Sequence, residues 1–502
     1  MDLLILGLKT IASPQVLLWI CLGVVMGVIF GALPGVSATM AIVLCISFTY
    51  SMDPVVAIAF LSAVYCAAIT GGGITAILFK IPGTPSSAAT VLDGYPMVQR
   101  GEAGKALTIS LVCSALGGLV SCLIMFFLTQ PLMRVALKFG SPEMFAVCCL
   151  GLGILIFLDE KNKINTFVSG FIGLWLGTIG MDYFSSVTRF TFGTSKLLDG
   201  IDPLPFMLGL FAAVEVLNVV HTPRDMDAFS KDKQAKVTKL ASFKDIWVVK
   251  GTTLRSGVIG TVTGIIPGAG ATIASWLAYA TEKKFSKHPE MLGQGDPHGI
   301  AASETANNAA TGGAMVPLLS MGIPGSNAAA MMMTALAIHG VQMGPLLLRK
   351  QPQFLSTTFL AMILANILMV FVSLIVAKAF ATILRVPYHA LGTFIMLLAF
   401  TGCYAYQASI SDVLIMAIGG VFGYFFKKYN FNSSALILGL VLGPLTEKHL
   451  RRGISLKGSF FAFFKSPIVC VIFAAIIILY ASLIIKAIKK KKAENAAPAV
   501  ET

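Results

Sequence analysis

The sequence predicts an all-α polytopic membrane protein, built as two inverted structural repeats with broken or re-entrant helices at Pro-Gly motifs. Of its 502 residues, 56% are hydrophobic and 12% are charged, with a mean hydropathy of +0.84. Soluble domains carry about 25% charged residues. Several uncharged runs are long enough to span a bilayer, and Pro-Gly pairs recur inside apolar sequence in both halves. These three observations together predict the fold class.

Long uncharged runs mark the clearest membrane spans, at residues 106–129, 355–377 and 468–485. A span needs about 20 apolar residues. Because glycine and proline interrupt other apolar runs, we expect about ten to twelve membrane segments in all. A cleavable signal peptide is not expected, since the first long apolar run, 16–33, lacks a strongly basic leader and continues into a Pro-Gly pair.

The formal net charge of +14 suggests at first a nucleic-acid or acidic partner. Much of the excess of positive over negative charge, however, lies in one loop, from His221 to Arg255, and in the C-terminal tail from Lys486. Lysine and arginine next to membrane spans favour the cytoplasmic side. We therefore expect both segments in the cytoplasm, with the lipid bilayer and not nucleic acid as the partner.

Two motifs of the N-terminal half recur in the C-terminal half. Gly31-Ala-Leu-Pro-Gly-Val-Ser-Ala-Thr matches Gly264-Ile-Ile-Pro-Gly-Ala-Gly-Ala-Thr, and Lys80-Ile-Pro-Gly-Thr-Pro matches Gly322-Ile-Pro-Gly-Ser-Asn at a similar separation. The match continues through the later apolar segments. The predicted organisation is an N-terminal transmembrane repeat at 1–220, a cytoplasmic linker at 221–250, a C-terminal transmembrane repeat at 251–450, a final transmembrane segment at 451–486 and a cytoplasmic tail at 487–502.

The two cytoplasmic segments also predict how the repeats are oriented. Counting spans back from each places the loop at 159–163 inside and its equivalent at 407–411 outside. Equivalent loops on opposite faces define an inverted repeat, the construction of many secondary transporters. The same count places Arg451, Arg452 and Lys457 outside, against the charge rule.

The Pro-Gly pairs predict a polar site inside the membrane. Proline removes a backbone donor and glycine permits unusual dihedral angles, so each pair should break a helix, and such breaks survive only in protein or beside a wet cavity. A helix that restarts after a break presents free N–H groups and partial positive charge, which suits a carboxylate. The candidate solute-binding residues are Pro34, Gly35, Ser37, Thr39, Pro82, Gly83, Thr84, Ser86, Ser87, Gly268, Thr272, Asn307, Asn308, Thr311, Pro324, Gly325, Ser326 and Asn327.

Glu304 is a candidate for ion coupling, because ionisable groups inside a membrane are costly and functional by default. Asp93-Gly94 and His339-Gly340 follow the second breaks and are weaker candidates. The alternative for all of these residues is structural. Pro-Gly pairs also form ordinary turns between helices, small residues allow close helix packing, and each ionisable group could cap a helix or lie at a membrane face.

Enzyme chemistry is not expected. The chain has no nucleotide-binding Gly-x-x-x-x-Gly-Lys-Ser/Thr motif and no evident acid/base pair, and its nine cysteines lie in apolar segments without a Cys-x-x-Cys pair. No metal site and no cofactor are therefore predicted, apart from a coupling cation, sodium or proton. The leading hypothesis is a secondary transporter, and the alternatives are a passive channel and a non-transporting membrane scaffold for partner subunits.

A set of short motifs carries a resemblance to a known family. They are Gly31 to Thr39, Ile81-Pro-Gly-Thr-Pro, Leu92-Asp-Gly-Tyr-Pro, Arg189-Phe-Thr-Phe-Gly, Ser286-Lys-His-Pro-Glu, Glu304-Thr-Ala-Asn-Asn-Ala, Gly322-Ile-Pro-Gly-Ser and Leu438-Gly-Leu-Val-Leu-Gly-Pro-Leu. In these motifs the sequence resembles the large membrane subunit, the TctA type, of the tripartite tricarboxylate transporter family. The resemblance extends to about Lys457. The chain departs from the family pattern at Ala68-Ile-Thr-Gly-Gly-Gly, which lacks the usual tyrosine before paired glycines, and at Ser303, where proline is common.

The resemblance implies a multi-pass protein of the bacterial inner membrane. It would be the carrier subunit of a cation-coupled importer of organic di- and tricarboxylates. The implied partners are a small membrane subunit and a periplasmic solute-binding protein, which delivers the carboxylate.

Overall fold

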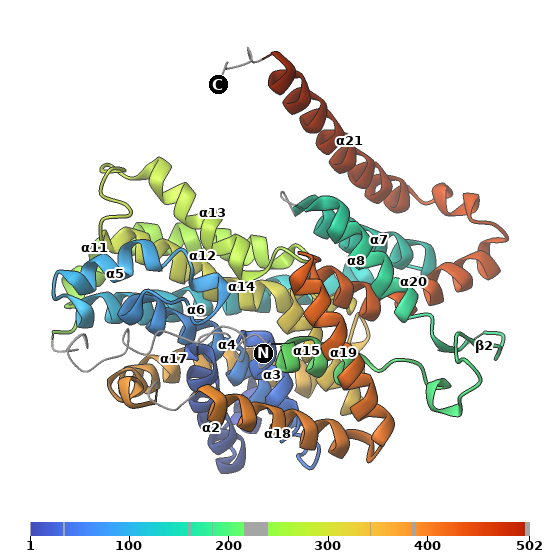
Figure 1. The fold of residues 1–502 in the computed structure, drawn as a ribbon, viewed down its shortest axis with the longest axis horizontal. Helices are drawn as coiled ribbons and strands as arrows, with labels where there is room; N and C mark the ends of the chain where they lie inside the picture. The colour runs from blue at the N-terminus through green and yellow to red at the C-terminus, as the bar shows by residue number, and fades with distance from the viewer. Residues whose placement is uncertain are drawn as a thin grey trace. The chain divides into compact units, whose positions relative to one another are not determined.

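Apolar helix-forming runs dominate the sequence, and the computed structural model forms helices almost throughout (Figure 1). The structure describes residues 2–33, 36–158, 162–182, 184–214, 239–341, 343–383 and 388–496. The chain divides into two compact units. The first contains Met1–Leu137 and Ile201–Tyr429, and the second contains Lys138–Gly200 and Asn430–Thr502. Each unit therefore draws segments from both predicted repeats.

The first unit holds most of the helices. From its N-terminal segment come α1 (Asp2–Ile11), α2 (Pro14–Ala32), α3 (Ala38–Ile46), α4 (Pro54–Phe79), the short helix η1 (Pro85–Ser87), α5 (Val91–Gln99) and α6 (Ala103–Ala136). Its later segment holds α9 (Pro203–Met207), the π-helical turn η3 (Leu208–Ala213), α11 (Phe243–Val248), α12 (Lys250–Ile265), α13 (Gly270–Phe285), α14 (Pro297–Met321), α15 (Asn327–Ile338), α16 (Leu347–Lys350), α17 (Pro352–Ile383), α18 (Tyr388–Gln407) and α19 (Ile410–Lys428).

The second unit is smaller. It contains α7 (Ser141–Leu158), α8 (Lys163–Leu176), β1 (Gly180–Met181), β2 (Thr188–Arg189), η2 (Ser195–Leu197), α20 (Ser433–Lys457), η6 (Phe461–Lys465) and α21 (Pro467–Ala496). The two strands pair antiparallel, with Gly180 opposite Arg189. Phe145 of α7 packs on Phe463 of η6, with ring centroids 6.0 Å apart, so an aromatic cluster joins the unit's two chain segments.

Five of the described helices are long and apolar enough to cross a membrane. They are Pro14–Ala32, Pro54–Phe79, Ala103–Ala136, Pro352–Lys378 and Ile410–Lys428. Four shorter apolar helices accompany them, at Ser141–Ile154, Pro203–Ala213, Asn327–Ile338 and Pro467–Ala481. The predicted all-helical, multi-pass membrane class is therefore confirmed.

Glycines let helices of the first unit approach closely. In the N-terminal half, α2 packs on α4, and a Cβ atom at Gly31 would collide with the carbonyl oxygen of Ala68. In the C-terminal half, α12 packs on α14, and a Cβ atom at Gly264 would collide with the carbonyl oxygen of Ala310. Figure 1 shows α12, α13 and α14 side by side. Both helix pairs thus bring a broken helix against the middle of a long one.

Candidate functional site

The first Pro-Gly region of the N-terminal half separates α2 from α3. Helix α2 ends at Ala32 and α3 begins at Ala38, so the predicted helix break is present. Ser37 caps α3, because its Oγ accepts a hydrogen bond from the amide of Met40 at 3.2 Å. Thr39 is buried in the first turn. The candidates Pro34 and Gly35 lie outside the described residues.

The second break of this half turns the chain back into the protein. Helix α4 ends at Phe79, Lys80 adopts a left-handed φ of +59°, and the amide of Gly83 donates to the carbonyl oxygen of Gly72 at 3.2 Å. A Cβ atom at Gly83 would collide with the carbonyl oxygen of Gly31. The two breaks of the N-terminal half therefore meet, and the half-buried Pro82 lies beside this contact.

Hydroxyl groups after the second break bind to one another. The Oγ atoms of Thr84 and Ser86 lie 3.0 Å apart, and Ser87 donates to the carbonyl oxygen of Thr84 at 2.8 Å. All three residues are buried. The structure thus brings these three candidates together in one tight turn, ahead of α5.

The C-terminal half repeats this arrangement of breaks. Helix α12 ends at Ile265 and α13 begins at Gly270. The amide of Gly268, which has a φ of +82°, donates to the carbonyl oxygen of Gly325 at 3.0 Å, so the breaks at Pro267 and Pro324 touch. Thr272, in the first turn of α13, is exposed.

Ser326 connects the second break of the C-terminal half to α4. Its Oγ caps α15 by accepting from the amide of Ala329 at 3.1 Å, and the Tyr65 hydroxyl lies 3.1 Å from the same oxygen. Asn327 begins α15 and is half-buried. Sequence analysis missed Tyr65, because its partner lies far along the chain.

Helix α14 carries a buried polar face. Asn308 donates to the side-chain oxygen of Asn366 on α17 at 2.6 Å and to the carbonyl oxygen of Ser114 on α6 at 2.9 Å. Thr311 donates to the carbonyl oxygen of Asn308 within the helix. All of these side chains are fully buried. Asn366 was also missed, although a lone asparagine inside an apolar span is a usable signal.

Glu304 lies one turn before Asn308 on α14 and is fully buried. Its Oε1 accepts from the hydroxyl of Thr90 at 2.5 Å, while its Oε2 has no hydrogen-bond partner among the described residues. Asn307 is close enough to influence the carboxylate, yet neither its amide nitrogen nor its oxygen has a described hydrogen-bond partner. No described lysine or arginine forms an ion pair with Glu304. Polar atoms of Glu304 and Asn307 without a described hydrogen-bond partner therefore lie close together inside the protein.

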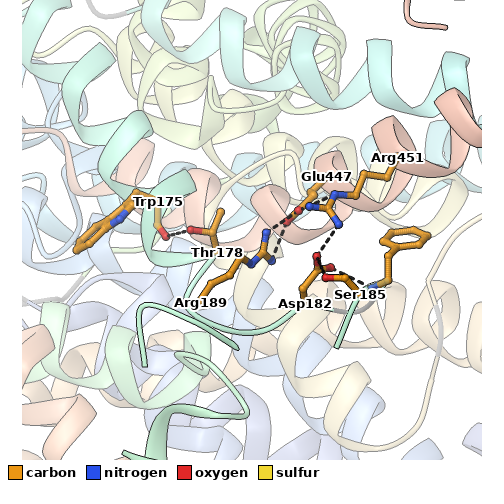
Figure 2. A network of polar contacts seen from close by, with 8 residues as sticks. Trp175, Thr178, Asp182, Ser185, Arg189, Glu447 and Arg451 are labelled. Carbon is orange, nitrogen blue, oxygen red and sulfur yellow. Dashed lines mark hydrogen bonds and ion pairs between the residues drawn. The ribbon is translucent and has the colours of Figure 1, made fainter. Parts of the chain in front are cut away.

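A separate network of charges lies in the second unit (Figure 2). Arg189 binds Glu447 of α20 through two nitrogens, at 2.7 and 3.1 Å, and Arg451 binds Asp182 at 2.5 Å and Glu447 at 3.1 Å. Hydrogen bonds from Ser185 and a backbone amide, with the Arg451 guanidinium, hold the pKa of Asp182 well below its usual range. Because each charge faces an opposite charge, this network ties the strand pair to α20 and leaves no free carboxylate. It also neutralises Arg451, which the predicted orientation places outside.

Metal-ligand chemistry is not evident in the part of the chain that the structure describes. It contains no group of three or more His, Cys, Asp or Glu side chains placed to hold a metal ion. The described polar groups that converge near the helix breaks are mainly neutral amides and hydroxyls, and Glu304 is the carboxylate among them that keeps an oxygen without a described partner.

Helices broken inside apolar sequence, with buried polar side chains at the breaks, define a class of multi-pass membrane proteins to which many secondary transporters belong. The chain belongs to the tripartite tricarboxylate transporter TctA family, whose model matches residues 17–438. It is 34% identical over 489 residues, 97% of both chains, to an Agrobacterium vitis protein described as an uncharacterized 52.8 kDa protein in the TAR-I ttuC' 3' region. A second Agrobacterium vitis protein, uncharacterized and described from the TAR-II ttuC' 3' region, is 34% identical over 225 residues, 43% of this chain and 93% of that protein.

The two neighbouring asparagines should respond differently to truncation. Asn308→Ala removes two buried hydrogen bonds and leaves the side-chain oxygen of Asn366 without its donor, which costs about 1–3 kcal/mol. Asn307→Ala removes at most a weak contact with Glu304 and should change the free energy of unfolding by less than about 1 kcal/mol. The unfolding midpoint of the purified protein in detergent measures both effects. Equal destabilisation by the two substitutions would contradict this assignment.

Proposed function

We propose that this chain is the carrier subunit of a cation-coupled, binding-protein-dependent secondary importer of organic di- and tricarboxylates. Membership of the TctA family makes it a tricarboxylate transporter subunit and implies a small membrane subunit and a periplasmic binding protein as partners. We place it in a bacterial inner membrane. Cation coupling is supported by one observation: the carboxylate of Glu304 is fully buried and has no basic partner among the described residues.

A cation is the natural partner for Glu304. An uncompensated charge in a protein interior costs several kcal/mol, so it is stabilised by a proton or by a cation. The open oxygens of Glu304 and Asn307 are ligands of the kind that sodium takes, and broken helices add carbonyl groups in such transporters. Proton or sodium coupling therefore explains why Glu304 is tolerated.

The carboxylate solute would bind at the restarted helices. Helices α3, α13 and α15 each begin directly after a break, and their first turns carry unpaired N–H groups and partial positive charge. Ser37 and Ser326 contribute hydroxyls at two of these starts. Helix N-termini of this kind bind anionic solutes in transporters with broken helices.

We further propose that the two halves are inverted repeats that work by alternating access. Equivalent contacts support the repeat: a Cβ atom at Gly83 would collide with the carbonyl of Gly31, and one at Gly325 would press on the carbonyl of Gly264. The position of basic residues supports the orientation, because Lys105, which pairs with Asp245 at 2.8 Å, and Arg255 lie near the expected cytoplasmic linker. The solute site would then lie between the halves.

A passive channel and a non-transporting scaffold are less consistent with these features. A channel selects ions with rings of charged side chains or repeated carbonyl filters, whereas the polar groups here cluster at paired helix breaks. A scaffold would gain nothing from burying Glu304 without a partner, because such a charge costs stability.

Replacing Glu304 or Asn307 should abolish uptake without loss of the protein from the membrane. In cells that contain the partner subunits, we expect Glu304→Gln and Asn307→Ala to reduce uptake of a radiolabelled tricarboxylate more than tenfold, a loss of about 1.4 kcal/mol or more. Asp53→Asn is the matched control, because this exposed carboxylate caps α4 through one amide and makes no contact with Glu304 or Asn307 in the described residues. Wild-type uptake should stop when sodium and proton gradients collapse. Full uptake by both variants, or uptake driven by ATP without either gradient, would refute the proposal.

Inverted topology predicts opposite accessibility of two equivalent loops. On a cysteine-free background, a cysteine that replaces Asn162 should react with a membrane-impermeant maleimide only from the cytoplasm, and one that replaces Ala408 only from outside. Both residues are exposed in the structure. Reaction of both from the same side would mean a parallel repeat, in which the two halves cannot act as opposed gates.

A further inference from the structure

A second buried carboxylate, that of Asp93 on α5, accepts more hydrogen bonds than the carboxylate of Glu304. Its Oδ1 accepts hydrogen bonds from three backbone amides, those of Gly293, Gly295 and Asp296, each at 2.8 Å. Its Oδ2 accepts from the hydroxyl of Tyr279 on α13, also at 2.8 Å. Asp93 is fully buried. Four donors therefore surround one carboxylate.

The connection between α13 and α14 is shaped around this carboxylate. Gly293 and Gly295 have φ values of +90° and +95°, which a residue with a side chain rarely adopts. These dihedrals turn successive amides toward one point and create an anion-binding nest. A Cβ atom at Gly299 would collide with Asp93 Oδ2. Arg100 donates to the carbonyl of Gly295 and holds the connection from its other side.

The nest joins elements from the two halves of the chain. Asp93 follows the break at Pro82 in the N-terminal half, whereas the α13–α14 connection follows the break at Pro267 in the C-terminal half. Leu292 of this connection clusters with Ala89 and Tyr279, and Ala89 is fully buried. The contact therefore closes one end of the interface between α5 and α14.

The interface between α5 and α14 also includes Glu304. Thr90, one turn before Asp93, donates to Glu304, and the hydroxyls of Thr90 and Ser303 lie 3.0 Å apart. Glu304 lies in α14 just beyond Gly299, which packs against Asp93. If α5 moved so that Asp93 left the nest, Thr90 would move with it away from Glu304.

The opposite pair of elements is joined by fewer described hydrogen bonds. His339, at the end of α15, places Nε2 3.1 Å from the hydroxyl of Thr49 in the connection between α3 and α4. At the other end of α15, Ser326 lies 3.1 Å from the hydroxyl of Tyr65 on α4. These are two side-chain contacts, in contrast to the four bonds that Asp93 accepts. Lys283, Lys284 and Lys287 lie at the α13–α14 connection, which favours the cytoplasmic face for the strong contact.

We propose that Asp93 and the nest formed by Gly293, Gly295, Asp296 and Tyr279 are the latch of a cytoplasmic gate. This inference rests on the proposed carrier function. The latched state closes the cytoplasmic side, and release of Asp93 opens a path past Ala89 toward Glu304. Asp93 is a positioning residue in this account, because it acts through the two helices and does not touch the solute.

Accessibility of Ala89 tests the latch directly. On a cysteine-free background, Ala89→Cys provides a reporter under Leu292, and its reaction rate with a membrane-impermeant maleimide is measured in inside-out vesicles. Asp93→Asn should raise the rate about tenfold, because hydrogen bonds to the charged carboxylate are each worth a factor of this order. Tyr279→Phe removes one bond and should raise it less. Asp53→Asn, which alters an exposed carboxylate that caps α4 through one amide, is the matched control and should leave the rate unchanged.

The outcomes separate the latch from the proposed function. Reaction of Ala89→Cys at the control rate in Asp93→Asn and Tyr279→Phe would overturn the latch, and if Asp93→Asn is absent from the membrane, Tyr279→Phe alone decides. Solute counterflow is then measured in proteoliposomes that contain the same variants together with the small membrane subunit, with the solute-binding protein added. The latch predicts that Asp93→Asn keeps counterflow but accumulates less solute. Absence of counterflow in the otherwise wild-type reporter would refute the carrier function and leave the labelling comparison intact.

Discussion

Backbone groups freed by broken helices must find partners inside the protein, because a bilayer offers none. The structure meets this constraint by bringing the breaks of each half together: Gly268 donates to the carbonyl of Gly325, and Gly83 lies against the carbonyl of Gly31. Such contacts require backbones to touch, which explains glycine at Gly31 and Gly264 along the packed helices. The same arrangement leaves the first turns of α3, α13 and α15 beside polar side chains.

Asp93 and Glu304, two of the buried carboxylates of the first unit, show how partners decide a role. Asp93 accepts four hydrogen bonds and is satisfied within the chain. Glu304 accepts one from Thr90 and keeps an open oxygen. A satisfied carboxylate holds two elements together, whereas an unsatisfied one needs a ligand. We therefore assign the latch to Asp93 and cation binding to Glu304, with Thr90 between them.

Sequence analysis predicted the membrane class, the helix breaks and the family, because composition, Pro-Gly chemistry and short motifs are local properties. It also singled out Glu304 and Asn308. It missed Tyr65, Thr90 and Asn366, since their partners lie far along the chain and appear only when the helices pack. The nest around Asp93 is built mainly from backbone amides, which no residue pattern identifies. The two contact units each mix N- and C-terminal segments, an arrangement that a linear repeat does not reveal.

Binding of a cation at Glu304 is the central claim, and the thermal stability of the purified full-length protein tests it most directly. The unfolding midpoint of wild type should rise saturably with sodium in place of choline, or with falling pH if the ion is a proton. A ligand at 100 times its Kd stabilises by about 2.7 kcal/mol. Glu304→Gln should lose the sodium response, or show a smaller rise with falling pH than wild type if the ion is a proton, because the other titratable groups still contribute. Identical responses of wild type and Glu304→Gln to sodium and to pH would contradict the account.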